Sequence, residues 1–223
     1  MSDKGDLVYS LPKFEVKAND KAAKRLLKHK LRDELPQPKI TKGWSLKEQL
    51  VGAFKISPRG IDQAQTKVNY FIGNDKSKWC SNLLTYNMIS FDEVYPGIDF
   101  SLNAHGNKVE KTFTVNPGAD VDKIKLKLKG FNSITVNDKG ELEIATGLGT
   151  VCFTKPVAYQ EKDGKREYVQ VSYRLDGETY GFTVGDYDKS IPLIIDPLLA
   201  STFNSGEIIN DFGGYCYEGD NST

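Results

Sequence analysis

Residues 123–129 read Lys-Ile-Lys-Leu-Lys-Leu-Lys, with an apolar side chain at every second position and lysine at the others. In an extended strand successive side chains point to opposite faces, so a period of two places Ile124, Leu126 and Leu128 on one face. The stretch therefore predicts a half-buried β-strand over residues 123–129. Its lysine row would face solvent and would also discourage edge-to-edge association.

Turn signals recur on the C-terminal side of this strand. Asn137-Asp138-Lys139-Gly140, Lys162-Asp163-Gly164 and Asp176-Gly177 supply residues that tolerate positive φ. The expected strands between and beyond these turns are 133–136, 141–145, 151–153, 157–160, 168–175, 180–184 and 191–197. Short strands at this spacing, without βαβ alternation, predict an all-β fold of mainly antiparallel, sandwich-like or barrel-like sheets.

One short helix is expected near the N-terminus, over residues 19–35. Ala23, Leu27 and Leu31 lie four residues apart and form an apolar stripe, and Pro36 would end the helix. The opposite face is rich in lysine. A stripe of this length more often docks on its own domain than on a membrane. The predicted fold class is therefore all-β with one short N-terminal helix.

The composition divides the chain into three expected parts. Residues 1–48 form a basic N-terminal arm with short strands and the helix. Residues 49–199 form the antiparallel β domain. Residues 200–223 are rich in Gly, Asn, Asp and Ser and contain few large aliphatic side chains, which is typical of a flexible tail or of the start of another segment.

The overall charge and hydropathy exclude several classes of protein. The net charge is zero, from 30 basic and 30 acidic residues, which argues against a nucleic-acid-binding protein. No run of 18 apolar residues is present, so no membrane insertion is expected. The first residues contain no apolar signal-peptide segment. Three cysteines without a CxxC pair, and two histidines, predict neither a disulfide framework nor a metal site.

Catalytic motifs are missing from the sequence. It contains no GxSxG elbow, no papain-like cysteine motif and no phosphate-binding loop, since Gly147-Leu148-Gly149 is not followed by Lys-Ser/Thr. Asp186 and Asp188 are two apart and could point the same way, but aspartates at such positions more often bond to turn backbone. We therefore expect no enzyme activity, no catalytic residue, no metal and no cofactor.

Five motifs follow one another along the chain. They are Val68-Asn69-Tyr70-Phe71-Ile72-Gly73-Asn74-Asp75 with Ser77-Lys78-Trp79, Val94-Tyr95-Pro96-Gly97-Ile98-Asp99, Phe113-Thr114-Val115-Asn116-Pro117-Gly118-Ala119-Asp120, Lys155-Pro156-Val157-Ala158-Tyr159-Gln160 and Pro192-Leu193-Ile194-Ile195-Asp196-Pro197. In this order they resemble the uncharacterised N-terminal β domain of large bacterial and archaeal proteins with SBBP-type β-propeller repeats. The resemblance covers about residues 49–199. Ser201-Thr202-Phe203 and Asn210-Asp211-Phe212-Gly213-Gly214 resemble the truncated start of a first repeat.

The resemblance implies a non-catalytic structural or binding module. Its parent would be a secreted or surface-anchored protein with adhesion-type modules, so that the domain is extracellular or at the cell surface. Contact with the following repeat domain, and with a surface glycan or protein, is implied as well. The family offers no catalytic residue to carry over.

Five residues are the candidate binding residues within these motifs: Trp79, Tyr70, Tyr95, Tyr159 and Asp99. Aromatic rings can stack on a sugar, although packing in the core is their more common role. A carbohydrate-binding module is therefore an alternative function. A glycoside hydrolase with an unrecognised carboxylate pair is a second alternative.

Overall fold

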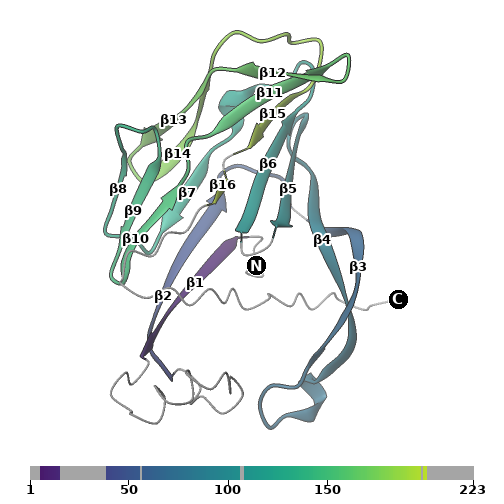
Figure 1. Cartoon of the computed structure of the whole chain (residues 1–223), viewed down its shortest axis with the longest axis vertical. Helices are drawn as coiled ribbons and strands as arrows, with labels where there is room; N and C mark the ends of the chain where they lie inside the picture. Colours follow the sequence, from purple (N-terminus) through teal and green to yellow (C-terminus); the bar gives the residue numbers. More distant parts are fainter. Residues whose placement is uncertain (1–5, 16–38, 56, 106–107, 197, 200–223) are drawn as a thin grey trace, which may run out of the picture.

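The computed structural model describes residues 6–15, 39–55, 57–105, 108–196 and 198–199 (Figure 1). These residues form sixteen β-strands and two 3-10 helices of one turn each. The strands divide among three sheets, and every strand pair is antiparallel.

The first sheet has five strands in the order β1-β2-β7-β14-β13. Their bounds are β1 Leu7–Glu15, β2 Lys39–Leu50, β7 Leu126–Lys129, β14 Thr179–Val184 and β13 Val171–Asp176. A three-stranded sheet has the order β10-β9-β8, with β10 Gly149–Phe153, β9 Leu142–Thr146 and β8 Ser133–Val136.

The third sheet has eight strands. Seven follow the order β12-β11-β15-β6-β5-β4-β3, and β16 also pairs with β6. The bounds are β12 Lys165–Val169, β11 Val157–Lys162, β15 Leu193–Asp196, β6 Lys108–Val115, β5 Ile98–His105, β4 Cys80–Tyr95, β3 Arg59–Tyr70 and β16 Leu198–Leu199. The 3-10 helices are η2 Lys76–Lys78, between β3 and β4, and η3 Val121–Lys123, before β7.

The fold class predicted from the sequence is corrected in its helical part. The described residues are all-β and contain no helix of seven or more residues. Residues 19–35, for which the sequence predicts the helix, lie outside the described residues, as do residues 200–223. A single apolar stripe is weak support for a helix because most helical stability in proteins comes from tertiary packing.

The alternating stretch 123–129 is strand over part of its length. Residues up to Lys123 belong to η3, and β7 begins at Leu126. Asp120 begins η3 because its side chain accepts a hydrogen bond from the backbone N–H of Asp122 at 3.0 Å. Each of the three apolar side chains of the stretch, Ile124, Leu126 and Leu128, is fully buried.

Residues 39–48, which the sequence assigns to the basic N-terminal arm, supply most of β2. β2 pairs with β1 on one side and with β7 on the other, so the expected domain boundary near residue 48 falls inside a strand. β1 continues through Pro12 because β1 is an edge strand, where a residue without a backbone N–H is tolerated.

The core lies between the inward faces of the three sheets. Phe113 of the eight-stranded sheet and Phe182 of the five-stranded sheet are fully buried, and their ring centroids are 5.9 Å apart. Phe153 of the three-stranded sheet meets Tyr180 of the five-stranded sheet at 6.1 Å. All three sheets therefore share one apolar interior, in the manner of a β-sandwich.

Candidate functional site

The β3–β4 hairpin, residues 59–95, extends beyond the rest of its sheet (Figure 1). β4 pairs with β5 over Met88–Tyr95, whereas its pairing with β3 continues as far as Cys80. Among the described residues, the far half of the hairpin is thus a two-stranded ribbon without a third strand. Ribbons of this kind are only marginally stable in water by themselves.

Bulges twist this ribbon. Two shifts of register interrupt the pairing of β3 with β4, and Asp62 and Asn82 adopt positive φ of 56° and 57°. The bends are held by side chains, because the Asn82 backbone N–H donates to Asn69 Oδ1 at 2.9 Å and Asn87 Nδ2 donates to Asp62 Oδ2 at 2.9 Å. Bulges increase the local twist, which turns the hairpin away from the plane of its sheet.

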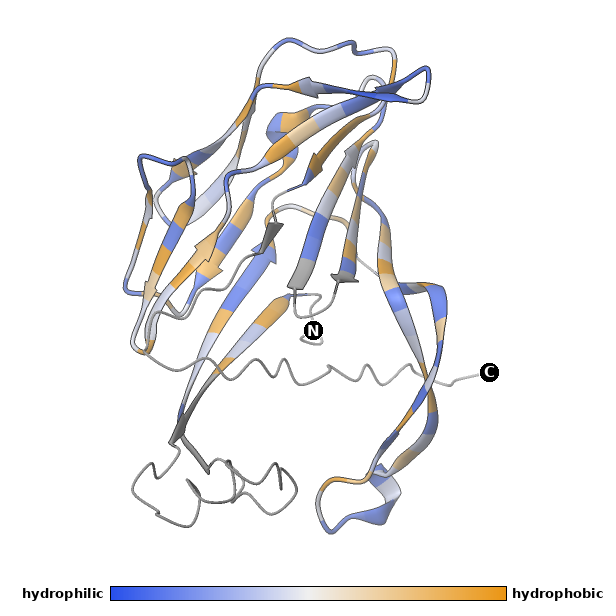
Figure 2. Cartoon of the chain, viewed as in Figure 1, coloured by the Kyte–Doolittle hydropathy of each residue, from blue (hydrophilic) through white to orange (hydrophobic). Residues whose placement is uncertain are grey.

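Exposed apolar side chains are concentrated on this hairpin. Of the thirteen large hydrophobic residues that are exposed in the described chain, eight lie between residues 59 and 95. They are Val68, Tyr70, Phe71, Ile72, Trp79, Leu84, Tyr86 and Ile89. Figure 2 shows apolar positions along both strands and at the tip. A contiguous exposed apolar surface is typical of an interaction site.

The tip is ordered by an aromatic pair. The rings of Phe71 and Trp79 meet edge to face, with centroids 5.5 Å apart and planes at 61°. Trp79 Nε1 donates to the Gly73 carbonyl at 3.2 Å, and Lys76 Nζ lies 5.7 Å from the Trp79 ring. These contacts pre-organise the tip although Phe71 remains 55% exposed.

The helix η2 makes the tip basic. Asp75 caps η2 by accepting hydrogen bonds from Ser77 Oγ at 2.6 Å and from the Ser77 backbone N–H at 3.1 Å. These two bonds lower the pKa of Asp75 below its ordinary value. Residues 67–80 contain Lys67, Lys76 and Lys78 but only one carboxylate, Asp75, so the tip carries a net positive charge.

The structure does not bring the five candidate binding residues together. Trp79 and Tyr70 lie at the hairpin tip and are 38% and 39% exposed. Tyr159 lies on β11, near the opposite edge of the same sheet, with its ring 6.3 Å from Tyr168. Tyr95 is buried in the core, and its hydroxyl donates to the Lys125 carbonyl at 3.0 Å. Burial raises the pKa of Tyr95 to about 12.

Asp99 stabilises the C-terminal end of β4. Its Oδ1 accepts a hydrogen bond from the Glu93 backbone N–H at 2.8 Å, and Glu93 has a positive φ of 50°. Its Oδ2 accepts from Asn116 Nδ2 at 3.0 Å. The register of β4 with β5 shifts at this place. Asp99 therefore stabilises the bulge at the C-terminal end of β4, next to the turn into β5.

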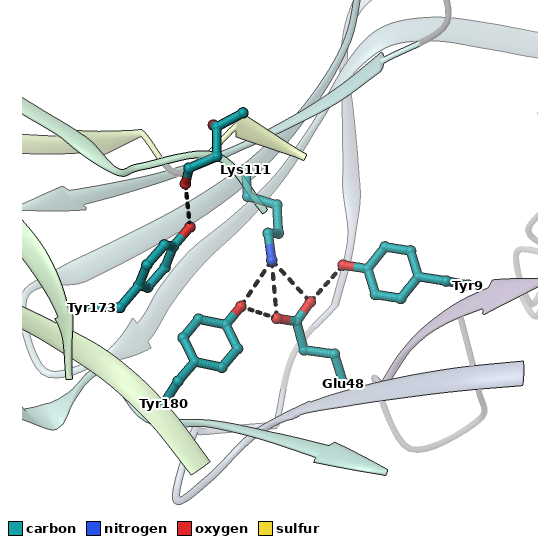
Figure 3. A network of polar contacts seen from close by, with 6 residues as sticks. Tyr9, Glu48, Lys111, Tyr173 and Tyr180 are labelled. Atoms are coloured by element: carbon teal, nitrogen blue, oxygen red, sulfur yellow. Dashed lines mark hydrogen bonds and ion pairs between the residues drawn. The ribbon is translucent and has the colours of Figure 1, made fainter. Parts of the chain in front are cut away.

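A second group of polar side chains lies inside the core (Figure 3). Lys111 Nζ is 2.9 Å from Glu48 Oε1 and 3.2 Å from Oε2, and both side chains are 1% exposed. Two tyrosines complete the group. Tyr180 accepts from Lys111 Nζ at 2.9 Å and donates to Glu48 Oε1, and Tyr9 donates to Glu48 Oε2 at 2.5 Å. We call these four residues the buried polar cluster.

The electrostatics of this cluster follow from burial. Desolvation lowers the pKa of Lys111, and the facing Glu48 carboxylate opposes that effect. Desolvation, reinforced by Glu48, raises the pKa of Tyr180 well above its ordinary value, so this hydroxyl keeps its proton. Lys111 Nζ also lies 4.1 Å from the centroid of the Phe153 ring. Aromatic faces and tyrosine hydroxyls thus replace water around the ion pair.

The sequence contains a signal for this cluster that motif reasoning missed. Lys111 lies two and four residues before the buried Phe113 and Val115, so it is on the same face of β6 as they are. Glu48 lies two residues after the buried Leu46 and is therefore on the same face of β2. A charged residue that shares a strand face with buried apolar residues is a candidate for a buried ion pair.

A surface hollow of about 380 Å³ lies beside η3, but of the two carboxylates that line it, Asp120 caps η3 and Asp122 pairs with Arg174. No group of three or more His, Cys, Asp or Glu side chains among the described residues could hold a metal ion. The helices in the described part of the chain are all too short and too polar to cross a membrane.

A known family matches most of the chain. The model of a family described as a domain of unknown function, DUF7948, matches residues 2–198. The match spans the basic N-terminal arm and the β domain together. No curated protein and no solved structure matches the chain.

Proposed function

We propose that this chain, which belongs to the DUF7948 family of domains of unknown function, is a non-catalytic structural or binding module of a larger cell-surface or secreted repeat protein. The observation that carries this proposal is the β3–β4 hairpin, whose far half leaves the sheet with its apolar side chains exposed. Covering apolar surface gains about 25 cal/mol per Å², so a partner that packs on the hairpin would also stabilise it.

The following repeat domain is the partner that the topology favours. β16 pairs Leu198 with Glu110 of β6, Glu110 faces Asn103 of β5, and Asn103 faces Met88 of β4. Met88 is the residue at which the hairpin leaves the sheet. The strands of this row are spaced about 4.8 Å apart, so the chain reaches its last described residues roughly 15 Å from the hairpin base.

The resemblance to the β domain that precedes SBBP-type repeats supports the same arrangement. A domain that follows residue 199 would begin beside the hairpin, and the basic tip would favour an acidic or apolar face on it. The extracellular or cell-surface location and the repeat architecture of the parent are parts of this proposal.

Site-specific photo-crosslinking in the full-length parent tests the proposal. A photoreactive phenylalanine analogue at Ile72, 65% exposed at the tip, should form an intramolecular crosslink to the segment after residue 199. The matched control is the same analogue at Tyr168, 72% exposed near the opposite edge of the sheet, which should form none. Equal crosslinking from both positions, or none from Ile72, contradicts the proposal.

A glycan array tests the carbohydrate alternative. A sugar platform is usually a row of parallel exposed rings, whereas Phe71 and Trp79 meet at 61°. We therefore expect no glycan signal that depends on the tip. A robust signal that the substitution Trp79→Ala abolishes would replace a protein partner with a surface glycan.

A further inference from the structure

The buried polar cluster holds an amine and a carboxyl group in contact, away from water. Lys111 belongs to β6 of the eight-stranded sheet and Glu48 to β2 of the five-stranded sheet, so the pair spans the interior between the two sheets. Both carboxylate oxygens of Glu48 lie within 3.2 Å of Lys111 Nζ. The carbon Cδ, to which both oxygens are bonded, therefore also lies close to Nζ. Reacting atoms at contact distance in a rigid site react as if at about 10⁵–10⁸ M.

The apolar surroundings penalise the charge on Lys111. Two charges in an apolar interior carry a large desolvation penalty, which a proton transfer from the ammonium to the carboxylate removes. Burial shifts the pKa of Lys111 downward, in the direction that this transfer requires. The neutral amine has a lone pair, and the neutral carboxyl group has a hydroxyl that can leave as water.

We propose that Lys111 and Glu48 condense to an intramolecular amide that covalently joins the two large sheets. The Nζ lone pair attacks Cδ of the protonated Glu48 carboxyl group and forms the Nζ–Cδ bond. The bond from Cδ to Oε1 then breaks, and Oε1 leaves as one water molecule with the hydroxyl proton and one proton from Nζ. No electron is gained or lost, and no co-reactant is needed.

The two tyrosines are placed for complementary roles in this step. Tyr180 accepts a hydrogen bond from Nζ and donates one to Oε1, so it can pass a proton from the attacking nitrogen to the leaving oxygen. Tyr9 donates to Oε2, the oxygen that remains as the amide carbonyl, and stabilises the charge that develops on it. Their aromatic neighbours exclude the water that would reverse the reaction.

The amide would close a loop that contains the hairpin. Glu48 and Lys111 are 63 residues apart, and β3, β4 and β5 lie between them. Tension along the chain would pass directly from β2 to β6, and the hairpin would not carry it. This inference does not depend on the identity of the partner that covers the hairpin.

Intact mass spectrometry of the purified, folded chain tests the amide. We expect the denatured protein to weigh less than its sequence by one water molecule. After digestion, a branched peptide should contain Glu48 and Lys111, and trypsin should fail to cleave after Lys111. An unmodified mass after prolonged incubation at neutral pH overturns the inference. So does a water loss that maps to Asp163-Gly164 or Asp176-Gly177, where aspartate can cyclise.

Variants assign the roles of the residues. Lys111→Arg keeps the positive charge but has no simple amine, and its mass should equal that of its sequence. Tyr180→Phe should slow the appearance of the amide about 100-fold. Tyr173→Phe is the matched control because Tyr173 is buried beside the cluster but donates to the Thr154 carbonyl at 2.8 Å, and its rate should match that of the unsubstituted chain. Equal rates for Tyr180→Phe and Tyr173→Phe would remove Tyr180 from the reaction.

Discussion

Lys111 Nζ lies 2.9 Å from Glu48 Oε1 in the middle of the molecule, where the inward faces of its sheets meet. Among the described residues, the hydroxyls of Tyr9 and Tyr180 make further hydrogen bonds to the pair, and the Phe153 ring centroid lies 4.1 Å from Lys111 Nζ. The sandwich thus has a polar link at its centre, and the stability of the link depends on both partners being present.

Removing one partner of this ion pair should strongly destabilise the folded protein. Lys111→Met leaves Glu48 as an unpaired buried charge, and the free energy of unfolding should fall by at least about 3 kcal/mol. Urea denaturation followed by tryptophan fluorescence measures this change. A loss below about 1 kcal/mol, the range of exposed ion pairs, would contradict the burial of the pair.

Replacing both residues distinguishes between an ion pair and an amide at this position. The double variant Glu48→Leu with Lys111→Met should be less stable than the unsubstituted chain by about 4 kcal/mol, the loop-closure estimate for a crosslink across 63 residues. A pair held by charge alone predicts a different result, because apolar replacement of a buried ion pair is neutral or stabilising by about 1–4 kcal/mol.

The Tyr180 hydroxyl should contribute measurably to stability. Tyr180→Phe removes one donor and one acceptor from the buried polar cluster, and unfolding should become easier by about 1–3 kcal/mol. Tyr168→Phe, at an exposed tyrosine, is the control and should stay within about 0.5 kcal/mol. Equal effects of the two substitutions in urea titrations would contradict this role.

Amide hydrogen exchange should reveal the isolation of the hairpin. Backbone amides of β4 should exchange faster from Cys80 to Asn87 than from Met88 to Ser90, since among the described strands only the latter segment pairs with both β3 and β5. Exchange measured by mass spectrometry on the chain alone tests this. Uniform protection along β4 would show that other contacts cover the far half.

Gly130 should tolerate a side chain poorly. A Cβ at this position would lie 2.3 Å from the Ser45 carbonyl oxygen of β2, at a φ of +83°. Gly164 has a similar φ of +74° with open space around it, so Gly164→Ala should show only the left-handed backbone penalty of about 1–2 kcal/mol. Gly130→Ala should lose more than Gly164→Ala in thermal unfolding, and an equal loss would mean that β2 moves freely.

Asp196 should make stability depend on pH. Its Oδ1 is buried and accepts no hydrogen bond from the residues that the structure describes, and burial raises its pKa above 3.8. The folded state therefore holds the proton more tightly than the unfolded state, and the ionised carboxylate destabilises the fold at neutral pH. The variant Asp196→Asn should melt higher at pH 7, and the gain should disappear as the pH falls toward 3.8. A gain that persists at low pH would contradict this cause.

Part of the hairpin could be predicted from the sequence. The segment from Val68 to Trp79 is rich in aromatic residues, which singled out Tyr70 and Trp79 as candidate binding residues, and both lie at the exposed tip. The same reasoning chose Tyr95 and Tyr159 because they are the aromatic residues of two other motifs, yet Tyr95 is buried and Tyr159 lies near the opposite edge of the sheet. The residue type shows that an aromatic ring could stack on a ligand. Whether a ligand can reach the ring depends on the position of the residue in its strand.

The sequence by itself indicated most of the strands and turns that follow residue 123, because alternation and turn chemistry act over a few residues. Ile124, Leu126 and Leu128 are buried together, as their spacing predicts, although the strand begins at Leu126. Only the tertiary structure decided that Glu48 meets Lys111. Strand periodicity gives the face on which a side chain lies, but the partner across the core depends on which sheets stack and in what register.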